Sequence, residues 1–138
     1  ALTLTQEHAT HPEACLPLLG LIAAGEPIEA LETPNSVTVP SSLVRPDNFV
    51  LQVKGQSMID EQIQDGDYIV VKKTATARSG QIVVAIINDE ATLKCYVPKS
   101  DRIELHPRNP KFPIITIKKT DNFYINGVLL YSFREYAS

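Results

Sequence analysis

The sequence is poor in the residues that build redox and metal sites. Among its 138 residues it has two cysteines, Cys15 and Cys95, and three histidines. The cysteines lie in different contexts without metal-ligand spacing, and a chain of this size needs no disulfide to fold, so we expect reduced thiols in a cytoplasmic protein. His8 and His11 lie in a polar stretch that is typical of a solvated tail rather than of a metal site. We therefore expect neither a metal nor a cofactor.

The sequence also lacks a basic excess and a long hydrophobic run. Its net charge is −3, and the lysine pairs at 72–73 and 118–119 are typical of solvated strand ends, so by itself the chain is not expected to bind nucleic acid. No stretch is long enough to span a membrane. The most apolar run, Leu16–Gly25, is similar to the core of a signal peptide. However, it lacks a basic segment before it, and Pro17 and Gly20 interrupt it, which argues against secretion.

Long amphipathic helices are missing as well, and short strands take their place. Apolar or alternating runs are separated by turn residues such as Asn88-Asp89, a pattern typical of an all-β sandwich or barrel. The predicted strands cover 49–53, 68–71, 82–87, 92–97, 103–105, 114–117, 123–125 and 128–133. Asn126-Gly127, between the last two, predicts a type I′ hairpin. Single helical turns are expected at 40–44 and 58–64, and nothing supplies the two helices of a helix-turn-helix.

The length and these patterns together predict the domain organisation. A chain of 138 residues is long enough for one domain with a core but short for two. We expect one compact, mostly β domain of many short strands with little helix. It covers residues 16–138, including the segment 18–27, and follows a linker or tail over residues 1–15.

A candidate nucleophile lies in the segment Gly55-Gln56-Ser57-Met58, directly after the predicted strand 49–53. A serine that follows a glycine at a strand end can be presented to a cleft, and the adjacent backbone N–H groups could stabilise the oxyanion of an attacked carbonyl. Most serines in loops are only capping or turn residues, so this segment alone leaves a structural role for Ser57 open.

A candidate base for Ser57 is Lys94. The sequence has no Ser-x-x-Lys or Gly-x-Ser-x-Gly motif, and His106 precedes Pro107 at a strand end, where exposure is expected. Lys94 lies inside the predicted strand 92–97, where a lysine usually faces water. If it is buried instead, its ammonium loses hydration and its pKa falls, which leaves a neutral amine. Such an amine can remove the hydroxyl proton of serine and return it to a leaving amide nitrogen.

A candidate substrate lies in the same chain. The apolar segment Leu18–Pro27 ends in the small residues Ala23-Ala24-Gly25, and a peptide bond between Ala24 and Gly25 can enter a narrow cleft without steric obstruction. The proline after them cannot donate to a sheet ladder. A plain turn after a strand explains these residues equally well when they are taken alone.

Taken together, these features resemble the self-cleaving C-terminal domains of the LexA repressor family and its relatives, the UmuD proteins and lambda-type phage repressors. The resemblance runs from about Leu16 to the C-terminus. The matching motifs are Ala-Ala-Gly-Glu-Pro at 23–27, Gly-Gln-Ser-Met-Ile-Asp at 55–60, Asp-Gly-Asp at 65–67, Gly-Gln-Ile-Val-Val-Ala at 80–85 and Thr-Leu-Lys at 92–94.

The resemblance implies a β-rich fold of the LexA and signal peptidase type and a role for each site residue. Ser57 is then the nucleophile, Lys94 the base, and Ala24–Gly25 the bond that the domain cuts in its own chain. The backbone amides of Gln56 and Ser57 form the oxyanion hole.

The resemblance also implies a biological setting. Repressors of this family bind operator DNA through an N-terminal winged helix-turn-helix, which this chain is expected to lack, and they form homodimers through the C-terminal domain. An activated RecA filament on single-stranded DNA stimulates their self-cleavage, which inactivates the repressor in the SOS response to DNA damage. We expect segment 18–27 to alternate between docked and undocked positions with the undocked one dominating, so that RecA shifts a population.

Three other functions stay open at this point. The first is a UmuD-like self-processing protein of translesion synthesis, and the second is a non-enzymatic dimerisation module in which Ser57 and Lys94 are only structural. The third, a type I signal peptidase, shares the Ser–Lys chemistry but requires a membrane anchor, which this sequence does not show. For a dimer surface, the predicted strands 123–125 and 128–133 offer apolar residues and a free edge, although ordinary core strands have the same pattern.

Overall fold

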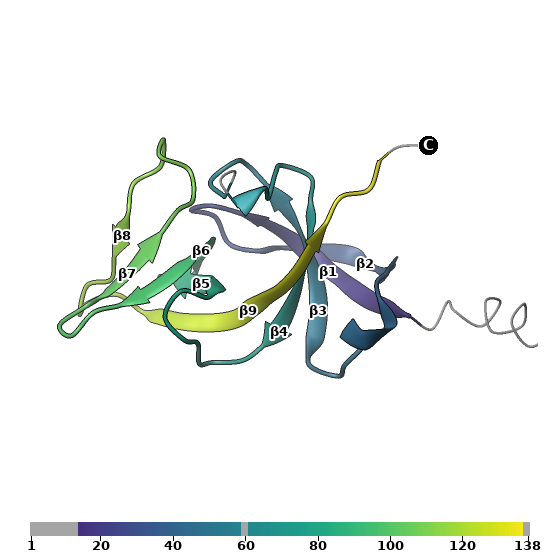
Figure 1. Cartoon of the computed structure of the whole chain (residues 1–138), viewed down its shortest axis with the longest axis horizontal. Coiled ribbons are helices and arrows are strands. Elements are labelled where there is room, and N and C mark those ends of the chain that lie inside the picture. The colour runs from purple at the N-terminus through teal and green to yellow at the C-terminus, as the bar shows by residue number, and fades with distance from the viewer. Residues whose placement is uncertain (1–13, 59–60, 137–138) are drawn as a thin grey trace, which may run out of the picture.

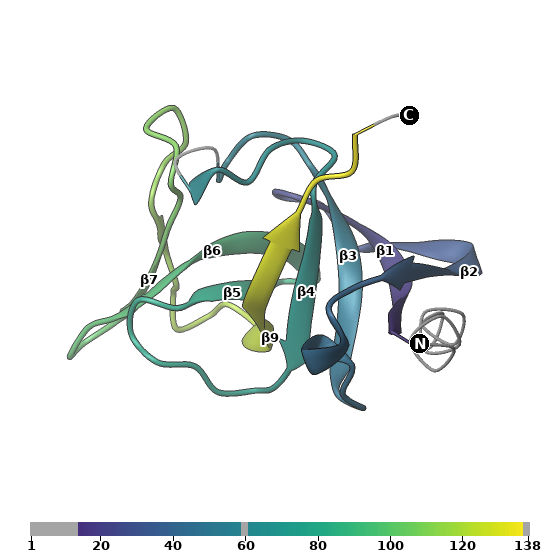
Figure 2. The ribbon, with the colours of Figure 1, turned by 45° about the vertical axis from the view of Figure 1, so that its right-hand side comes forward.

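One curved sheet makes up nearly the whole domain, as Figures 1 and 2 show. A computed structural model describes residues 14–58 and 61–136 of the chain. Within these residues the nine strands follow the order β2-β1-β3-β4-β9-β5-β6-β7-β8, and the 3-10 turn η2 (Ser41–Leu43) lies between β2 and β3 in the sequence. The strands are β1 (Cys15–Ala23), β2 (Glu29–Thr38), β3 (Asn48–Lys54), β4 (Tyr68–Lys73), β5 (Ile82–Ile87), β6 (Glu90–Pro98), β7 (Ile103–His106), β8 (Ile115–Thr116) and β9 (Phe123–Phe133).

This architecture confirms the mostly β fold. No helix among the described residues is long and apolar enough to cross a membrane. The helical turn predicted at 40–44 is η2, whereas the turn predicted at 58–64 includes residues 59–60, which lie outside the described residues. The predicted tail over residues 1–15 lies outside them up to residue 13, and β1 begins at Cys15.

The central strands are apolar at almost every position because both faces of the sheet are covered. In β3, Leu51 and Val53 face one cluster of buried side chains, while Val50 faces a second cluster on the opposite side. The larger cluster also contains Met58. Because Met58 is only 1% exposed and directly follows Ser57, the core fixes the chain at the candidate nucleophile.

The hairpin predicted at Asn126-Gly127 is wrong. Residues 123–133 form the single strand β9, which joins the two parts of the sheet: its first half pairs with β5 and its second half with β4. Figure 1 shows this long strand crossing from one part of the domain to the other. A Cβ at Gly127 would lie 2.6 Å from the carbonyl oxygen of Lys72 and collide with the side chain of Val71. The glycine therefore permits close approach of two strands rather than a turn.

A two-residue turn with the backbone of a type I′ hairpin lies at Asn88-Asp89 instead. Asn88 and Asp89 have φ angles of 50° and 71°, and Ile87 pairs with Glu90. This turn connects β5 to β6, as the turn residues predicted. In the resulting hairpin Lys94 pairs with Val83, and β6 lies between β5 and β7 in the sheet.

Strand β1 brings the candidate cleavage segment to the candidate nucleophile. It lies between β2 and β3, antiparallel to β2 and parallel to β3, and its last residue Ala23 pairs with Lys54, the last residue of β3. The chain after β3 leads directly to Ser57. Strand β2 was not predicted, because its sequence Glu-Ala-Leu-Glu-Thr-Pro-Asn-Ser-Val-Thr is polar and contains a proline.

Candidate active site

Ser57 and Lys94, which are 37 positions apart in the sequence, lie within hydrogen-bonding distance. The Nζ atom of Lys94 donates to Oγ of Ser57 over 3.2 Å. Strand β6 carries the lysine, and the turn after β3 carries the serine. Lys94 is 2% exposed. Its side chain is therefore buried and does not face water, as most lysines in strands do.

The surroundings of the Lys94 amine are neutral. Its Nζ atom donates to Oγ1 of Thr92 over 2.6 Å and to the carbonyl oxygen of Leu93 over 3.4 Å. Among the described residues no carboxylate forms an ion pair with it. Burial without a counter-ion lowers the pKa of Lys94 from its ordinary 10.5 to about 8. A neutral amine is therefore within reach near physiological pH.

Thr92 is a member of this site that the sequence reasoning missed. Its side chain is 3% exposed, and its hydroxyl makes the shortest of the hydrogen bonds to Lys94. Its place was predictable from the sequence, because Thr92 and Lys94 are two residues apart on one strand and such residues face the same side.

The predicted cleavage residues form a tight turn at the end of β1. The N–H of Glu26 donates to the carbonyl of Ala23 over 3.3 Å, which closes a β-turn with Ala24 and Gly25 at its centre. Gly25 has a φ of +80°, the backbone that the third position of a type II turn requires. The Ala24–Gly25 bond is thus the central peptide of the turn, and its carbonyl does not take part in the turn's own hydrogen bond.

This turn is docked on β6. The N–H of Gly25 donates to the carbonyl of Ala91 over 3.2 Å, and the N–H of Ala91 donates to the carbonyl of Glu26 over 2.7 Å. Ala91 precedes Lys94 by three residues on the same strand. In this structure the segment is therefore held against β6 by backbone hydrogen bonds. The expectation that the undocked position dominates concerns populations and stays a prediction.

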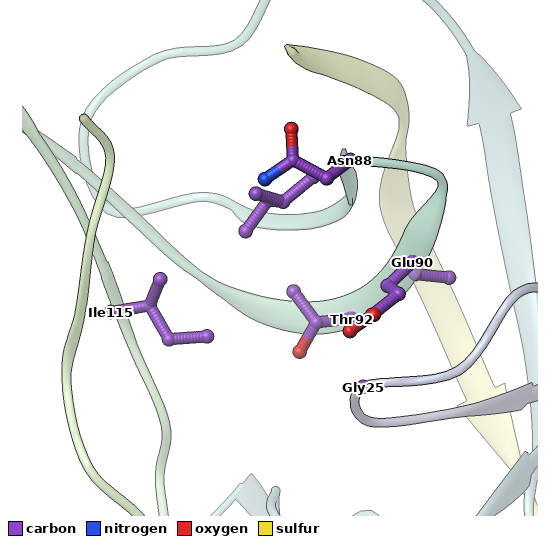
Figure 3. A pocket seen from close by; sticks show the side chains of 7 residues that line it. Gly25, Asn88, Glu90, Thr92 and Ile115 are labelled. Atoms are coloured by element: carbon purple, nitrogen blue, oxygen red, sulfur yellow. The ribbon is translucent and has the colours of Figure 1, made fainter. Parts of the chain in front are cut away.

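Two hollows flank the turn. A cleft of about 290 Å³ contains the predicted nucleophile and Ala24 together; its lining residues are Ala23, Ala24, Glu26, Lys54, Gly55, Gln56, Ser57 and Phe112. A second pocket of about 210 Å³ begins at Gly25 and reaches along the β5–β6 hairpin past Thr92 to Ile115, as Figure 3 shows. The two residues of the predicted scissile bond thus border different hollows.

The backbone on either side of Ser57 is held by the chain that follows β7. The Nδ2 atom of Asn109 donates to the carbonyl of Gln56 over 2.7 Å, and the N–H of Arg108 donates to the carbonyl of Ser57 over 3.2 Å. Within the described part of the chain, the amides of Gln56 and Ser57 donate no backbone hydrogen bond. The two amides were predicted from the sequence, whereas the contacts of Asn109 and Arg108 were not.

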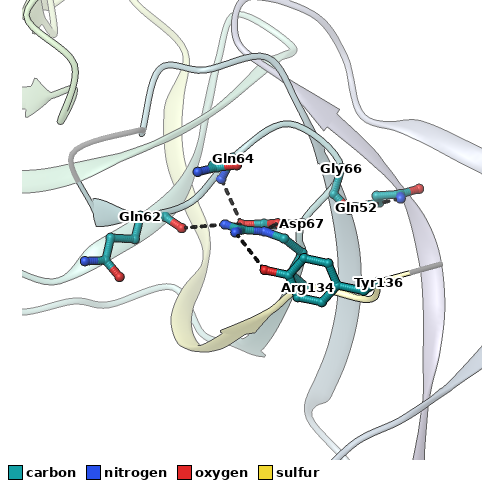
Figure 4. A network of polar contacts seen from close by, with 7 residues as sticks. All are labelled: Gln52, Gln62, Gln64, Gly66, Asp67, Arg134 and Tyr136. Atoms are coloured by element: carbon teal, nitrogen blue, oxygen red, sulfur yellow. Dashed lines mark hydrogen bonds and ion pairs between the residues drawn. The ribbon is translucent and has the colours of Figure 1, made fainter. Parts of the chain in front are cut away.

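The Asp-Gly-Asp motif at 65–67 closes the loop that carries Ser57. Oδ1 of Asp65 accepts the N–H of Gly55 over 2.9 Å at the start of this loop. Asp67, 2% exposed, binds the Nε and Nη2 atoms of Arg134 over 2.7 and 3.1 Å, as Figure 4 shows. The pKa of Asp67 is lowered, mainly because its carboxylate accepts hydrogen bonds from the Arg134 side chain. Burial by itself would raise this pKa. The motif is therefore structural.

His106 and the two cysteines lie within the described residues. The Nε2 atom of His106 lies 2.9 Å from Oε1 of Glu104, so the histidine pairs with this carboxylate and not with Ser57. His8 and His11 lie outside the described residues, and the described ones contain no cluster of three possible metal ligands. Cys15 and Cys95 are both free thiols.

Comparisons with known proteins identify relatives of this arrangement. The model of the Peptidase S24-like family matches residues 17–130. The LexA repressor of Syntrophotalea carbinolica is 51% identical over 124 residues, which cover 89% of this chain and 61% of that protein. The LexA repressors of Syntrophobacter fumaroxidans and Myxococcus xanthus are 43% and 49% identical; the matches cover 88% and 77% of this chain and 59% and 50% of those proteins. The chain thus spans half to three fifths of the length of these relatives.

Proposed function

The chain belongs to the Peptidase S24-like family, and on that premise we propose that it is the self-cleaving C-terminal part of a LexA-like repressor. Ser57 is the nucleophile, Lys94 the base, and the Ala24–Gly25 bond the substrate. The observation that carries the proposal is the 3.2 Å contact between Lys94 Nζ and Ser57 Oγ, at a buried amine without a counter-ion. The docked turn beside it supports the substrate assignment.

The reaction follows from the protonation state of Lys94. The neutral amine removes the Ser57 hydroxyl proton while Oγ attacks the carbonyl carbon of Ala24. The N–H groups of Gln56 and Ser57 stabilise the negative charge that develops on the carbonyl oxygen. Lys94 then gives its proton to the nitrogen of Gly25, which leaves as a new amino terminus. Water hydrolyses the ester between Ser57 and Ala24, with Lys94 again accepting a proton, and regenerates the serine.

The biological role is part of the same proposal. In this role the cut inactivates an SOS repressor that acts as a homodimer in the cytoplasm and binds operator DNA through an N-terminal domain. An activated RecA filament stimulates the cut by favouring the docked turn rather than by adding catalytic groups. The names of the relatives support the repressor role. The alternatives are a UmuD-like self-processing protein and a dimerisation module without catalysis.

Mass spectrometry of the chain after incubation at about pH 9–10, where Lys94 is deprotonated, tests the proposal. We expect one cut, between Ala24 and Gly25, because Ala24 lines the same cleft as Ser57. Ser57→Ala and Lys94→Ala should each abolish the cut while circular dichroism shows a folded domain. The matched control is Lys73→Ala, which removes an exposed lysine at the end of β4 and should cleave like the unaltered chain.

Three results would contradict the proposal. A cut at another bond would refute the substrate, and cleavage at a near-normal rate in either folded variant would refute the Ser57–Lys94 pair. An unaltered chain that stays intact throughout would favour the dimerisation module.

A further inference from the structure

The segment between β7 and β8 contacts the nucleophile's backbone rather than its side chain. We propose that Asn109 is a positioning residue, which aims the N–H of Ser57 into the cleft and thereby sets the oxyanion hole. This inference rests on the self-cleavage proposed above. It adds a residue that lies 52 positions from Ser57 and does not touch the reacting atoms.

The contacts of Asn109 give its side chain two separate tasks. The side chain is buried, with 6% of the residue exposed. Its Oδ1 atom accepts the N–H of Lys111 over 3.0 Å, and this contact stabilises the local turn. Its Nδ2 atom donates to the carbonyl of Gln56 over 2.7 Å, and no other described residue accepts from it. The donor half of the amide therefore acts on the nucleophile segment alone.

Peptide geometry links this contact to the oxyanion hole. In a planar trans peptide the C=O of one residue and the N–H of the next point in opposite directions. Because Asn109 fixes the direction of the Gln56 carbonyl, it also fixes the opposite direction of the Ser57 N–H. The Arg108 N–H holds the next carbonyl, that of Ser57, in the same way.

The Gln56–Ser57 peptide has few other restraints. The Gln56 side chain is exposed and makes no hydrogen bond to another described residue. Rotation of this peptide would withdraw the Ser57 N–H and turn a carbonyl dipole towards the cleft. That dipole would repel the developing negative charge, so loss of the Asn109 donor should slow the chemical step without altering Lys94.

The pH profile of self-cleavage in Asn109→Ala tests this role. The rate at high pH, where Lys94 is neutral, should fall about 10- to 100-fold, below the 10²- to 10³-fold loss of a whole oxyanion donor, since the N–H is misaligned and not removed. The midpoint of the profile should stay where it is in the unaltered chain. A variant that merely loosened the Ser57–Lys94 contact would move the midpoint.

Asn48→Ala is the matched control. Asn48 is likewise 6% exposed, and its Nδ2 donates to a backbone carbonyl, that of Leu43, over 2.8 Å. It supports the turn η2, outside the cleft. Asn48→Ala therefore loses a comparable buried hydrogen bond and should cleave at the rate of the unaltered chain.

Asn109→Asp keeps the inference testable if the alanine variant does not fold. Aspartate preserves the acceptor for Lys111 and the volume of the side chain but replaces the donor by a second acceptor, so the high-pH rate should fall at least as far. An unchanged high-pH rate in either folded variant would overturn the inference, as would a shifted midpoint in Asn109→Ala or an equal loss in Asn48→Ala. Failure of the proposed function can be distinguished from failure of this inference, because the unaltered chain itself would then not cleave.

Discussion

Two buried titratable side chains, Lys94 and Asp67, lie near opposite ends of one loop and have different kinds of partners. Lys94 contacts Ser57 near the start of the loop over residues 55–67, and Asp67 ends that loop; each is only 2% exposed. Asp67 accepts three hydrogen bonds, two from Arg134 and one from the N–H of Gln64. Lys94 has only neutral partners.

The difference determines how readily each of the two residues loses its charge. Both pKa values are lowered, but for an acid this means that the charged form is stabilised, whereas for a base it means that the charged form is destabilised. Asp67 therefore remains a carboxylate that anchors the loop, and Lys94 readily gives up its proton. Burial lowers the pKa of Lys94, and no counter-ion among the described residues offsets this shift.

Loss of the Asp67 counter-ion should have the largest effect on stability. In a Ser57→Ala background, which prevents self-cleavage, Arg134→Met should lower the free energy of unfolding in urea by about 2–3 kcal/mol at pH 7. Breaking a buried pair costs about 3–5 kcal/mol, and the value here is lower because Arg134 is about one third exposed.

The same substitution at the other residue is the control. Lys94→Met in the Ser57→Ala background should leave stability unchanged or raise it by about 1 kcal/mol at pH 7, since a buried ammonium without a partner is replaced by an apolar side chain. Equal destabilisation by both substitutions would show that the two sites do not differ as described.

The two residues should also affect stability in different pH ranges. Folding lowers the pKa of Lys94 from 10.5 to about 8, so between these values the unfolded chain holds a proton that the folded chain has lost, and stability rises with pH. Between pH 7.5 and 9.5 the gain is about 2 kcal/mol by linkage. The contribution of Asp67 is present above its ordinary pKa of 3.8 and is lost as the pH falls through its lower folded value.

Urea unfolding of the Ser57→Ala chain across these ranges measures both effects. The alkaline rise should vanish in Ser57→Ala/Lys94→Met, and the acid loss should become smaller in Ser57→Ala/Asp67→Asn, where the lowered pKa values of Glu104 and Asp121 still contribute to it. An alkaline rise that persists without Lys94 would assign it to another group.

The main features of the fold and the site were predictable because they are local in the sequence. Strands such as β5 are apolar runs bounded by turn residues, and the turn at Asn88-Asp89 predicted the hairpin that carries Lys94. The motifs around Ser57, Lys94 and Ala24-Gly25 pointed to residues that the structure brings to one region. Their catalytic roles stay proposals.

The features that sequence reasoning missed depend on contacts between distant segments. Asn126-Gly127 has the composition of a hairpin turn, yet the close approach of the neighbouring strands β9 and β4 is what requires Gly127. Nothing near Asn109 in the sequence reveals its contact with Gln56, 53 positions away. The pair of Asp67 and Arg134 spans 67 positions and is equally invisible before the chain is folded.

The pH dependence of self-cleavage in the unaltered chain tests the central claim most directly, because the claim is that an unpaired, buried Lys94 is the base. Rates measured from pH 6 to pH 10 should rise about tenfold per pH unit and level off above a midpoint near 8. A rate that does not change with pH, or a chain that remains uncut throughout this range, would contradict the account.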